Sequence, residues 1–562
     1  MNNNYISSVA LKMGGPGITD WSNDIHYHGE LIDLSVGQPD YPVPVEAITG
    51  AYEAACKGYN GYQDSQGIDE LRQRLLNKYN ISSEEDFDVA ITSGATAGLY
   101  LALMTCFEPG DEILITDPYF IQYLELIKIH NLVPVIIDIY PDFVINLDMI
   151  KKHISNKTKG IILNYPNNPT GCVITNSALE EIIDYLNEKN IYVIYDHIYS
   201  DYQYNVGQLE EQYHVAHYSN NVIYINGFSK SMRVTGWRVG YVIAPKRIIY
   251  YLTELQAQLY QGVTSTAQYG VLNAMDIDLS DMIKDYSERL MYLKENIDSH
   301  YKLSNANGSF FCFIKVPSCL KLSSLEFCKI LKTNGLLVVP GNVFSKRDTH
   351  FRLSICKPID DIKKAVNILN KVFYEIQINT IKEYIEKIIS KPVSLVGSYG
   401  MGINTPNSDI DFATFIMPDE SITKLDEILQ TNNFEFRGKR PSASNTMRYL
   451  YSFWWFDQFV DLVILLREDF DYLVNGIHCA NVSMSQTEKR YIIEKKIELE
   501  NSNIVDFENF KLSIYKRFIP QLLWLNDIDI CRSLIRKCKE QNMSFPSWLE
   551  EKIEEYNITI NE

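Results

Sequence analysis

Asn226-Gly-Phe-Ser-Lys-Ser-Met-Arg-Val-Thr-Gly-Trp-Arg-Val-Gly240 is the stretch that decides the fold of the first part of this chain. It follows the apolar run 221–225, and it places Lys230 in a tight Ser-Lys turn with Arg238 eight residues later. A lysine amine in such a turn can form a Schiff base with an aldehyde. Because an arginine beside it can bind a phosphate group, the stretch predicts a site for a phosphorylated aldehyde.

Outward from this stretch, residues 33–275 alternate short apolar runs with helical stretches. We expect strands at 88–92, 112–116, 160–165, 191–195 and 221–225. Such alternation predicts an α/β fold with a mostly parallel sheet between helices. Ligands of such sheets bind beyond the carboxyl ends of the strands. Gly94-Ala95-Thr96, Asn168, Asp196 and Lys230 each follow a predicted strand closely.

These residues supply the groups that a pyridoxal phosphate enzyme needs. Lys230 is the amine, and Asp196 can keep the pyridine nitrogen protonated, which makes the ring an electron sink. Tyr199 and Asn168 can donate near the ring hydroxyl. The turn at Gly94, Ala95 and Thr96, where a helix begins, offers backbone N–H groups to a phosphate, and Arg238 adds charge. Arg352 can bind a substrate carboxylate with both guanidinium branches.

The chain resembles the class I and II aminotransferases of fold type I across roughly residues 1–375. The resemblance rests on these segments: 34–40, 61–67, 164–171, 196–199, 228–240, 340–341 and 351–354. It implies a large lobe at about 46–275 and a small α+β lobe at about 1–45 plus 276–377. It also implies pyridoxal phosphate as cofactor, transamination between an amino acid and a 2-oxo acid, and catalysis by Lys230, Asp196 and Tyr199.

Three further roles and a homodimer come from the same resemblance. Phe120 stacks on the cofactor ring, Gly37 lies beside the substrate carboxylate, and Tyr62 reaches the cofactor phosphate of the neighbouring subunit. Active sites are then shared between two copies of the chain. The family often has a serine where Gly227 stands, and Ser229 and Thr96 can compensate for the lost hydroxyl. Relatives specific for dicarboxylates often carry a lysine where Thr96 stands, so its absence weakens an aspartate or glutamate preference.

A second unit follows an expected boundary at 377–381, between a helix at 360–376 and another at 381–390. Strands are expected at 393–396, 409–415 and 459–466. Strand side chains alternate, so Asp409 and Asp411 project from one face, and Asp461 on a later strand can join them. Carboxylates suit Mg²⁺, and two such ions can activate an attacking oxygen and stabilise a leaving pyrophosphate.

These residues resemble the minimal nucleotidyltransferases of the DNA polymerase beta superfamily. The match covers 396–402, 408–412 and Asp461, and it implies an α/β domain at 381–485 followed by a helical extension at 486–562. In that resemblance Gly397 and Ser398 meet a nucleoside triphosphate, and Asp409, Asp411 and Asp461 hold the metal. A nearby basic cluster either meets phosphates or lies in a solvated loop; its members are Arg437, Lys439, Arg440 and Arg448.

Three readings of the whole chain follow. In the first, a bifunctional enzyme transaminates one compound and transfers a nucleotide to a small-molecule acceptor. In the second, the C-terminal unit only binds nucleotide and regulates an aminotransferase. In the third, the first half is a pyridoxal phosphate lyase, cyclase or racemase, because those reactions share the same site residues. Arg352, Tyr62 and Asn168 favour transamination.

Composition restricts the partners and the compartment. The 52 Lys and Arg residues stand against 71 Asp and Glu, a net charge of -19, which disfavours binding to nucleic acid. The ten cysteines lack metal-type spacing and fit reduced thiols of a cytosolic protein. No apolar stretch is long enough for a signal peptide or a membrane span, so we expect a cytoplasmic protein without a membrane partner.

Overall fold

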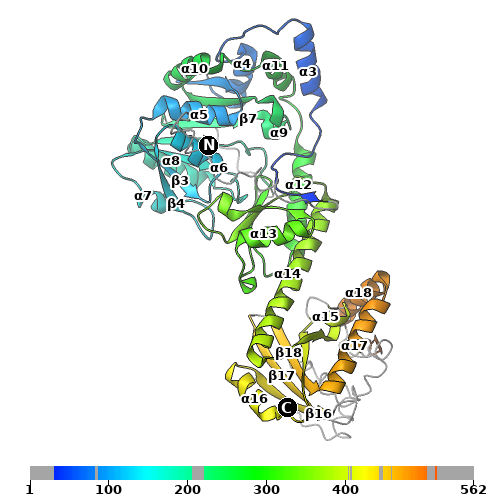
Figure 1. Cartoon of the computed structure of the whole chain (residues 1–562). Coiled ribbons are helices and arrows are strands. Elements are labelled where there is room, and N and C mark those ends of the chain that lie inside the picture. Colours follow the sequence, from blue (N-terminus) through cyan, green and yellow to red (C-terminus); the bar gives the residue numbers. More distant parts are fainter. Residues whose placement is uncertain are drawn as a thin grey trace, which may run out of the picture. The chain divides into compact units, whose positions relative to one another are not determined.

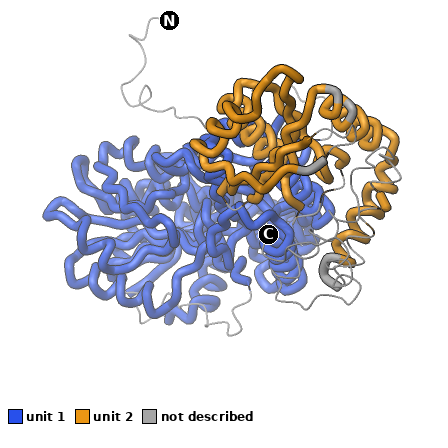
Figure 2. The backbone as a smooth tube through the Cα atoms, turned by 90° about the horizontal axis from the view of Figure 1, so that it is seen from below, with its two compact units in different colours: residues 1–373 blue, residues 374–562 orange. Residues whose placement is uncertain are grey.

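The computed structural model describes residues 31–82, 86–204, 220–402, 404, 408–441, 447–456, 458–502, 510 and 513–514. The chain divides into two compact units, Met1–Phe373 and Tyr374–Glu562 (Figure 2). Residues 1–30 of the expected small lobe and nearly all of the expected helical extension after 502 lie outside the described residues. No helix among the described residues is long and apolar enough to cross a membrane.

The first unit contains a seven-stranded sheet with the order β2-β8-β7-β6-β5-β3-β4 (Figure 1). Its strands are β2 (Phe87–Thr92), β3 (Glu112–Asp117), β4 (Val133–Asp138), β5 (Thr158–Asn164), β6 (Tyr192–Asp196), β7 (Val222–Gly227) and β8 (Gly240–Pro245). Only β8 runs antiparallel to its neighbours, β2 and β7. The expected α/β fold with a mostly parallel sheet is confirmed, although the sequence reading missed β4 and β8.

Helices cover both faces of this sheet, because its strands bury side chains on both sides. The helices of this lobe are α3 (Val45–Cys56), α4 (Asp69–Lys78), α5 (Ala95–Cys106), α6 (Ile121–Ile129), α7 (Leu147–Lys151), α8 (Asn176–Glu188), α9 (Phe228–Ser231), α10 (Lys246–Tyr260) and α11 (Ser265–Asn273). The alternation of strand side chains divides the core into two layers. Leu114 of β3 belongs to one layer, whereas Ile113 and Ile115 belong to the other.

A smaller α+β part completes the first unit. Its four-stranded sheet has the order β12-β13-β10-β9, and a separate parallel pair joins β1 to β11. The elements are β1 (Ile32–Asp33), α12 (Ser280–Asn296), β9 (Lys302–Leu303), β10 (Phe311–Lys315), α13 (Ser324–Thr333), β11 (Leu336–Leu337), β12 (Val339–Pro340) and β13 (His350–Ser354). The pairing of β1 with β11 attaches the described start of the chain to this part.

The two units share one helix, α14 (Ile359–Ile389), which has 31 residues. The expectation of two helices with a break at 377–380 was wrong. The segment Gln377-Ile-Asn-Thr380 contains neither glycine nor proline, so nothing in it interrupts the backbone hydrogen bonds. Gln377 is fully buried, and the division between the units falls inside the helix, after Phe373.

The second unit is built on a five-stranded sheet with the order β14-β15-β18-β17-β16. Its strands are β14 (Ser394–Val396), β15 (Ile410–Ile416), β16 (Glu435–Pro441), β17 (Met447–Trp455) and β18 (Gln458–Leu466). Its helices are α15 (Gly397–Met401), α16 (Ile422–Thr431), α17 (Arg467–Ser483) and α18 (Gln486–Ser502). The sequence reading found β14, β15 and β18 but missed the antiparallel pair β16 and β17, which carries the basic cluster.

Candidate active site

A pocket lies where β5, β6 and β7 end, as the rule for parallel sheets predicts. Most of the predicted residues line it together: Gly37, Ala95, Thr96, Phe120, Asn168, Asp196, Tyr199, Ser229, Lys230, Arg238 and Arg352. These eleven residues come from stretches spread between positions 37 and 352 of the sequence. Their convergence on one pocket is what the resemblance to the aminotransferases requires.

Lys230 lies in the one-turn helix α9, which begins where β7 ends. Its Nζ atom donates to the carbonyl oxygen of Gly37 at 2.7 Å. Burial, together with the positive charges of Arg352 and Arg238, lowers the pKa of Lys230 to about 8. The neutral, nucleophilic amine is therefore accessible near neutral pH, which an ordinary exposed lysine is not.

Asp196 is the last residue of β6 and is buried. Tyr123 donates to its Oδ2 atom at 2.7 Å, and the backbone N–H of Ile198 donates to Oδ1 at 3.3 Å. Burial raises the pKa of Asp196 to about 6, while the hydrogen bonds and the charge of Lys230 oppose that rise. The carboxylate is thus ionised at neutral pH and can hold a protonated ring nitrogen.

Arg352 projects from β13 and is only 2% exposed. Its Nη1 donates to Oδ1 of Asn168 at 2.9 Å, and its Nη2 donates to the carbonyl oxygen of Ser35 at 2.5 Å. The guanidinium lies between two rings, 4.3 Å from the centroid of Phe311 and 4.6 Å from that of Phe344. Burial lowers its pKa to about 10, so Arg352 remains charged at neutral pH.

Arg352 retains binding capacity in this arrangement. Its buried Nε atom has no hydrogen-bond partner among the described residues. Buried polar groups are nearly always satisfied, and a substrate carboxylate is the acceptor that suits a guanidinium. The amide nitrogen of Asn168 lies 3.5 Å from the hydroxyl of Tyr199, so the clamp connects to the tyrosine beside Asp196.

A phosphate cradle forms where α5 begins. Gly94 has φ of 79°, and a Cβ atom there would lie 2.5 Å from Nη2 of Arg238. A Cβ atom on Gly240 would lie 2.5 Å from the backbone nitrogen of Ala95. Two glycines therefore leave room for an arginine and for exposed N–H groups at a helix N-terminus, which bind anions. With Lys230 and Asp196, this donor set fits pyridoxal phosphate.

Thr96 lines the pocket with its hydroxyl bonded to α6, whereas Tyr62 lies outside the pocket. The hydroxyl of Thr96 donates to Oε1 of Gln122 at 3.1 Å, on the side of α6. Tyr62 is 92% exposed and does not line the pocket, so within one chain it does not join the site. Ser229 lines the pocket beside Lys230 and is buried.

The sequence reading missed several pocket residues. Tyr123, the partner of Asp196, lies three residues after Phe120. This spacing puts the two side chains on the same face of α6, and it was the signal in the sequence that could have identified Tyr123. Gln122 and Phe311 also line the pocket. Neither residue type marks a cofactor site by itself, so only the three-dimensional arrangement identifies them.

In the second unit, Asp411 and Asp461 are Cα partners on the parallel strands β15 and β18. Gly397, the first residue of α15, lies so close that a Cβ atom on it would be 2.0 Å from Oδ2 of Asp411. Ser398 is buried beside it. Asp409 immediately precedes β15. Among the described residues, no group of three or more His, Cys, Asp or Glu side chains is arranged to hold a metal ion, so the expected three-carboxylate site is not shown.

The basic cluster is only partly a set of exposed charges. Arg437 is an exposed residue of β16 and pairs with Glu435 at 3.2 Å. Lys439 is exposed on the same strand, whereas Arg448 of β17 is 5% exposed. Arg440 is opposite Arg448 in the strand register. The expectation of a solvated loop was wrong, because these residues belong to paired strands.

Comparison with known proteins identifies the first unit. The family model "Aminotransferase class I and II" matches residues 29–369. An aspartate aminotransferase of Sulfurisphaera tokodaii is 33% identical, over 60% of this chain and 88% of its own length. A (5-formylfuran-3-yl)methyl phosphate transaminase of Methanocaldococcus jannaschii is 30% identical, over 60% of this chain and 90% of its own length.

A solved structure agrees with these matches. The aromatic aminotransferase of Pyrococcus horikoshii aligns with a TM-score of 0.58 and 27% identity, covering 64% of this chain and 99% of that one. The range 29–369 that the family model matches contains Gly94, Asp196, Lys230 and Arg352. The chain therefore belongs to the class I and II aminotransferases, which use pyridoxal phosphate.

Proposed function

We propose that the first unit transfers the amino group of an α-amino acid to a 2-oxo acid. The observation that carries this proposal is the buried Arg352, held by Asn168 and Ser35 with an unpartnered Nε atom. Both substrates of a transamination carry a carboxylate next to the reacting carbon, and such a clamp serves both. A lyase, cyclase or racemase reading uses the same lysine but requires only one such substrate.

The residues of the pocket divide the chemistry between them. Pyridoxal phosphate supplies the electron sink when it is bound. Lys230, whose pKa of about 8 makes the neutral amine available, is the base that can move a proton at the substrate's α-carbon. Asp196 would hold the ring nitrogen, and the N-terminus of α5 with Arg238 would hold the phosphate. Asn168 and Arg352 orient the carboxylate.

The substrate pair can be found from single half-reactions. When the cofactor-loaded protein is mixed with an L-amino acid that it accepts, its visible absorption spectrum should change in proportion to the amino acid consumed. Adding the matching 2-oxo acid should restore the original spectrum. Relatives at about the same identity are named for aspartate and for a phosphorylated furan aldehyde, so both chemistries belong in the panel. Racemisation or elimination without amino transfer would support the alternative reading instead.

We infer in addition that two copies of the chain form the working enzyme. Large apolar side chains are exposed on α3 and the following loop, among them Tyr52 at 70%, Tyr59 at 42% and Tyr62 at 92%. Exposed apolar groups of this size are typical of interfaces. Light scattering measures the mass of the assembly in solution and so tests for two copies. Tyr62→Phe should weaken cofactor retention, because the Tyr62 hydroxyl is expected to reach the cofactor phosphate bound by the second copy.

A second activity is proposed for the second unit: transfer of a nucleotide from a nucleoside triphosphate to a small-molecule acceptor. The observation that favours it is the adjacency of Asp411, Asp461 and Gly397. Mg²⁺ is commonly held by one or two carboxylates plus substrate phosphates, so two neighbouring carboxylates are sufficient before the triphosphate binds. Magnesium-dependent release of pyrophosphate tests this proposal. Nucleotide binding without pyrophosphate would support the regulatory alternative.

A further inference from the structure

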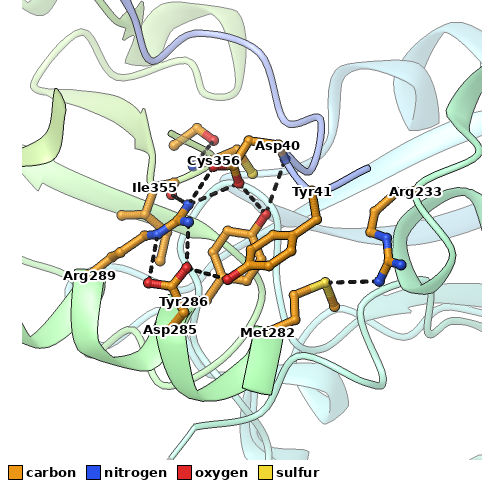
Figure 3. Close-up of polar contacts among 10 residues, drawn as sticks. Asp40, Tyr41, Arg233, Met282, Asp285, Tyr286, Arg289, Ile355 and Cys356 are labelled. Carbon is orange, nitrogen blue, oxygen red and sulfur yellow. Dashed lines mark hydrogen bonds and ion pairs between the residues drawn. The ribbon is translucent and has the colours of Figure 1, made fainter. Parts of the chain in front are cut away.

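An ionic cluster around the buried Arg289 joins α12 to the irregular segment that follows β1 (Figure 3). At its centre the side chain of Arg289 is 5% exposed. Its Nη1 atom donates to both carboxylate oxygens of Asp40, at 2.9 and 3.0 Å. On its other side, Nη2 and Nε donate to the two oxygens of Asp285, at 2.5 and 3.2 Å. One guanidinium therefore binds two carboxylates.

The same guanidinium also holds the strand that carries the substrate clamp. Nη1 of Arg289 donates to the carbonyl oxygen of Ile355 at 3.2 Å. Ile355 follows directly on β13, which ends at Ser354 and presents Arg352 to the pocket. Arg289 thus contacts two pieces of chain that are 315 residues apart in sequence, since it touches both position 40 and position 355.

The segment held through Asp40 supplies two walls of the pocket. The carbonyl oxygen of Ser35 accepts from Arg352, and the carbonyl oxygen of Gly37 accepts from Lys230. Residues 36–40 belong to no helix or strand, so ladder hydrogen bonds do not fix their position. The bond from Arg352 to the Ser35 carbonyl and the bonds from Arg289 to the Asp40 carboxylate therefore hold the chain on both sides of Gly37.

Two tyrosines reinforce the anchor at Asp40. The hydroxyl of Tyr286 donates to Oδ1 of Asp40 at 2.7 Å, and the hydroxyl of Tyr41 donates to Asp285 at 2.5 Å. Removing the charge of Arg289 would leave two carboxylates poorly compensated. A lysine has a single point charge and cannot reproduce the planar fork that contacts Asp40, Asp285 and Ile355 together.

We propose that Arg289 is a positioning residue for the substrate's α-carboxylate, an inference that rests on the proposed transamination. By holding Asp40 and Ile355 at once, it sets the separation between the Gly37 segment and Arg352. The substrate's α-carboxylate binds between the Gly37 segment and Arg352. Arg289 itself does not line the pocket, so its effect on binding passes through these two segments.

The test is Arg289→Lys in the full-length, cofactor-loaded protein, followed by stopped-flow titration of the half-reaction. The probe is the L-amino acid that reacts fastest with the unmodified protein, compared with its α-carboxamide. We expect the dissociation constant for the amino acid to rise roughly 10- to 100-fold, because small displacements of positioning groups have effects of this size. The constant for the carboxamide should change far less, and cofactor content and its visible spectrum should not change.

Arg74→Lys is the matched control, because Arg74 pairs with Asp276 at 2.5 Å on the surface and touches neither segment. It should leave both constants unchanged. If Arg289→Lys fails to retain cofactor, Asp40→Asn provides the second variant, since it keeps the side-chain shape and removes the charge. The same selective loss of amino-acid affinity is expected there.

The outcomes separate this inference from the function on which it rests. A folded, cofactor-loaded Arg289→Lys or Asp40→Asn protein that binds the amino acid as the unmodified protein does overturns the positioning role. Equal losses for the amino acid and its carboxamide also overturn it, because they indicate a general structural effect. An unmodified protein that reacts with no amino acid overturns the proposed transamination itself.

Discussion

Nζ of Lys230 donates a hydrogen bond to the carbonyl oxygen of Gly37 at 2.7 Å, and this contact spans 193 residues of sequence. It places the reactive amine against the segment that also meets the substrate clamp. The amine is enclosed there with two arginines and one carboxylate, and burial lowers its pKa to about 8. The protonation state of Lys230 is therefore set by the pocket and can be measured.

The first prediction concerns cofactor capture by the protein stripped of pyridoxal phosphate. Only the neutral amine attacks the aldehyde, so the rate should rise with pH and level off above about 8 instead of above 10.5, the ordinary lysine value. Stopped-flow absorbance across a pH series measures it. Asp196→Asn should move the plateau to lower pH, because the carboxylate charge raises the pKa of Lys230. Lys230→Ala should show no capture. A plateau only near 10.5 would contradict the prediction.

The second prediction concerns Tyr123. Its hydrogen bond favours the ionised form of Asp196, whose pKa burial raises to about 6. Tyr123→Phe should raise that pKa further, so activity should be lost at a higher pH on the acid side, by roughly one pH unit or more, since a hydrogen bond to a charged group is worth about 1.5–3 kcal/mol. Initial rates from pH 4 to 9 test this.

Tyr195→Phe is the matched control for Tyr123→Phe. Tyr195 is also a buried tyrosine, and its hydroxyl donates to the carbonyl oxygen of Tyr165 at 3.0 Å instead of to Asp196. Its removal should leave the acid limb of the pH profile in place. If both variants move that limb equally, the hydrogen bond to Asp196 is not the cause.

The third prediction concerns Arg352. Arg352→Ala removes a buried charge from the carboxylate clamp, so amino-acid binding should weaken by about 2–5 kcal/mol while cofactor binding persists. The cradle at Gly94 and Arg238 is separate from the clamp, and therefore retention of the cofactor is expected. Spectral titration of the half-reaction gives the affinity. Arg74→Ala should have no effect, and unchanged affinity in Arg352→Ala would place the clamp elsewhere.

The strand-end residues of this site could be predicted because local sequence carries the signal. Asp196 and Lys230 each follow an apolar run, and the carboxyl ends of parallel strands meet at one edge of the sheet. Gly94 could be predicted for the same reason, since a glycine between a strand and a helix leaves N–H groups exposed. The structure places Asp196 and Lys230 in one pocket, and Gly94 lies against Arg238, which lines that pocket.

Other parts of the site and fold depend on contacts that no local pattern specifies. The bond from Tyr123 to Asp196 joins residues 73 apart, and Arg289 reaches Asp40 over 249. The antiparallel strand β8 could not be predicted because its six residues, Gly240–Pro245, are all buried and show no polar alternation, so periodicity does not identify them as a strand. The continuous α14 was missed because polar residues at 377–380 resemble a loop, although Gln377 is fully buried.

The last prediction concerns the second unit. With Mg²⁺, a nucleoside triphosphate and a suitable acceptor, the protein should release pyrophosphate. Asp411→Asn and Asp461→Asn should each lower this rate by at least roughly 100-fold, because the metal's stabilisation of the transferring phosphate is worth several kcal/mol. Gly397→Ala should be as harmful, since its Cβ atom would lie 2.0 Å from Oδ2 of Asp411, at a φ of 63°.

Measuring both activities on the same Asp411→Asn protein decides between a second enzyme and a regulatory unit. If the unit is catalytic, pyrophosphate release stops and the amino-acid half-reaction proceeds at its normal rate, because the described residues that line the pocket around Lys230 all lie between Ser35 and Arg352. If the unit is a sensor, the unmodified protein binds nucleotide without releasing pyrophosphate, and Asp411→Asn changes the half-reaction instead.

Gly438→Ala is the control for the glycine substitution, since Gly438 also has a positive φ, 122°, but no atom lies within 4 Å of its Cβ position. A Gly438→Ala protein that loses pyrophosphate release as completely as Gly397→Ala would show that backbone strain in this unit, and not displacement of Asp411, is responsible.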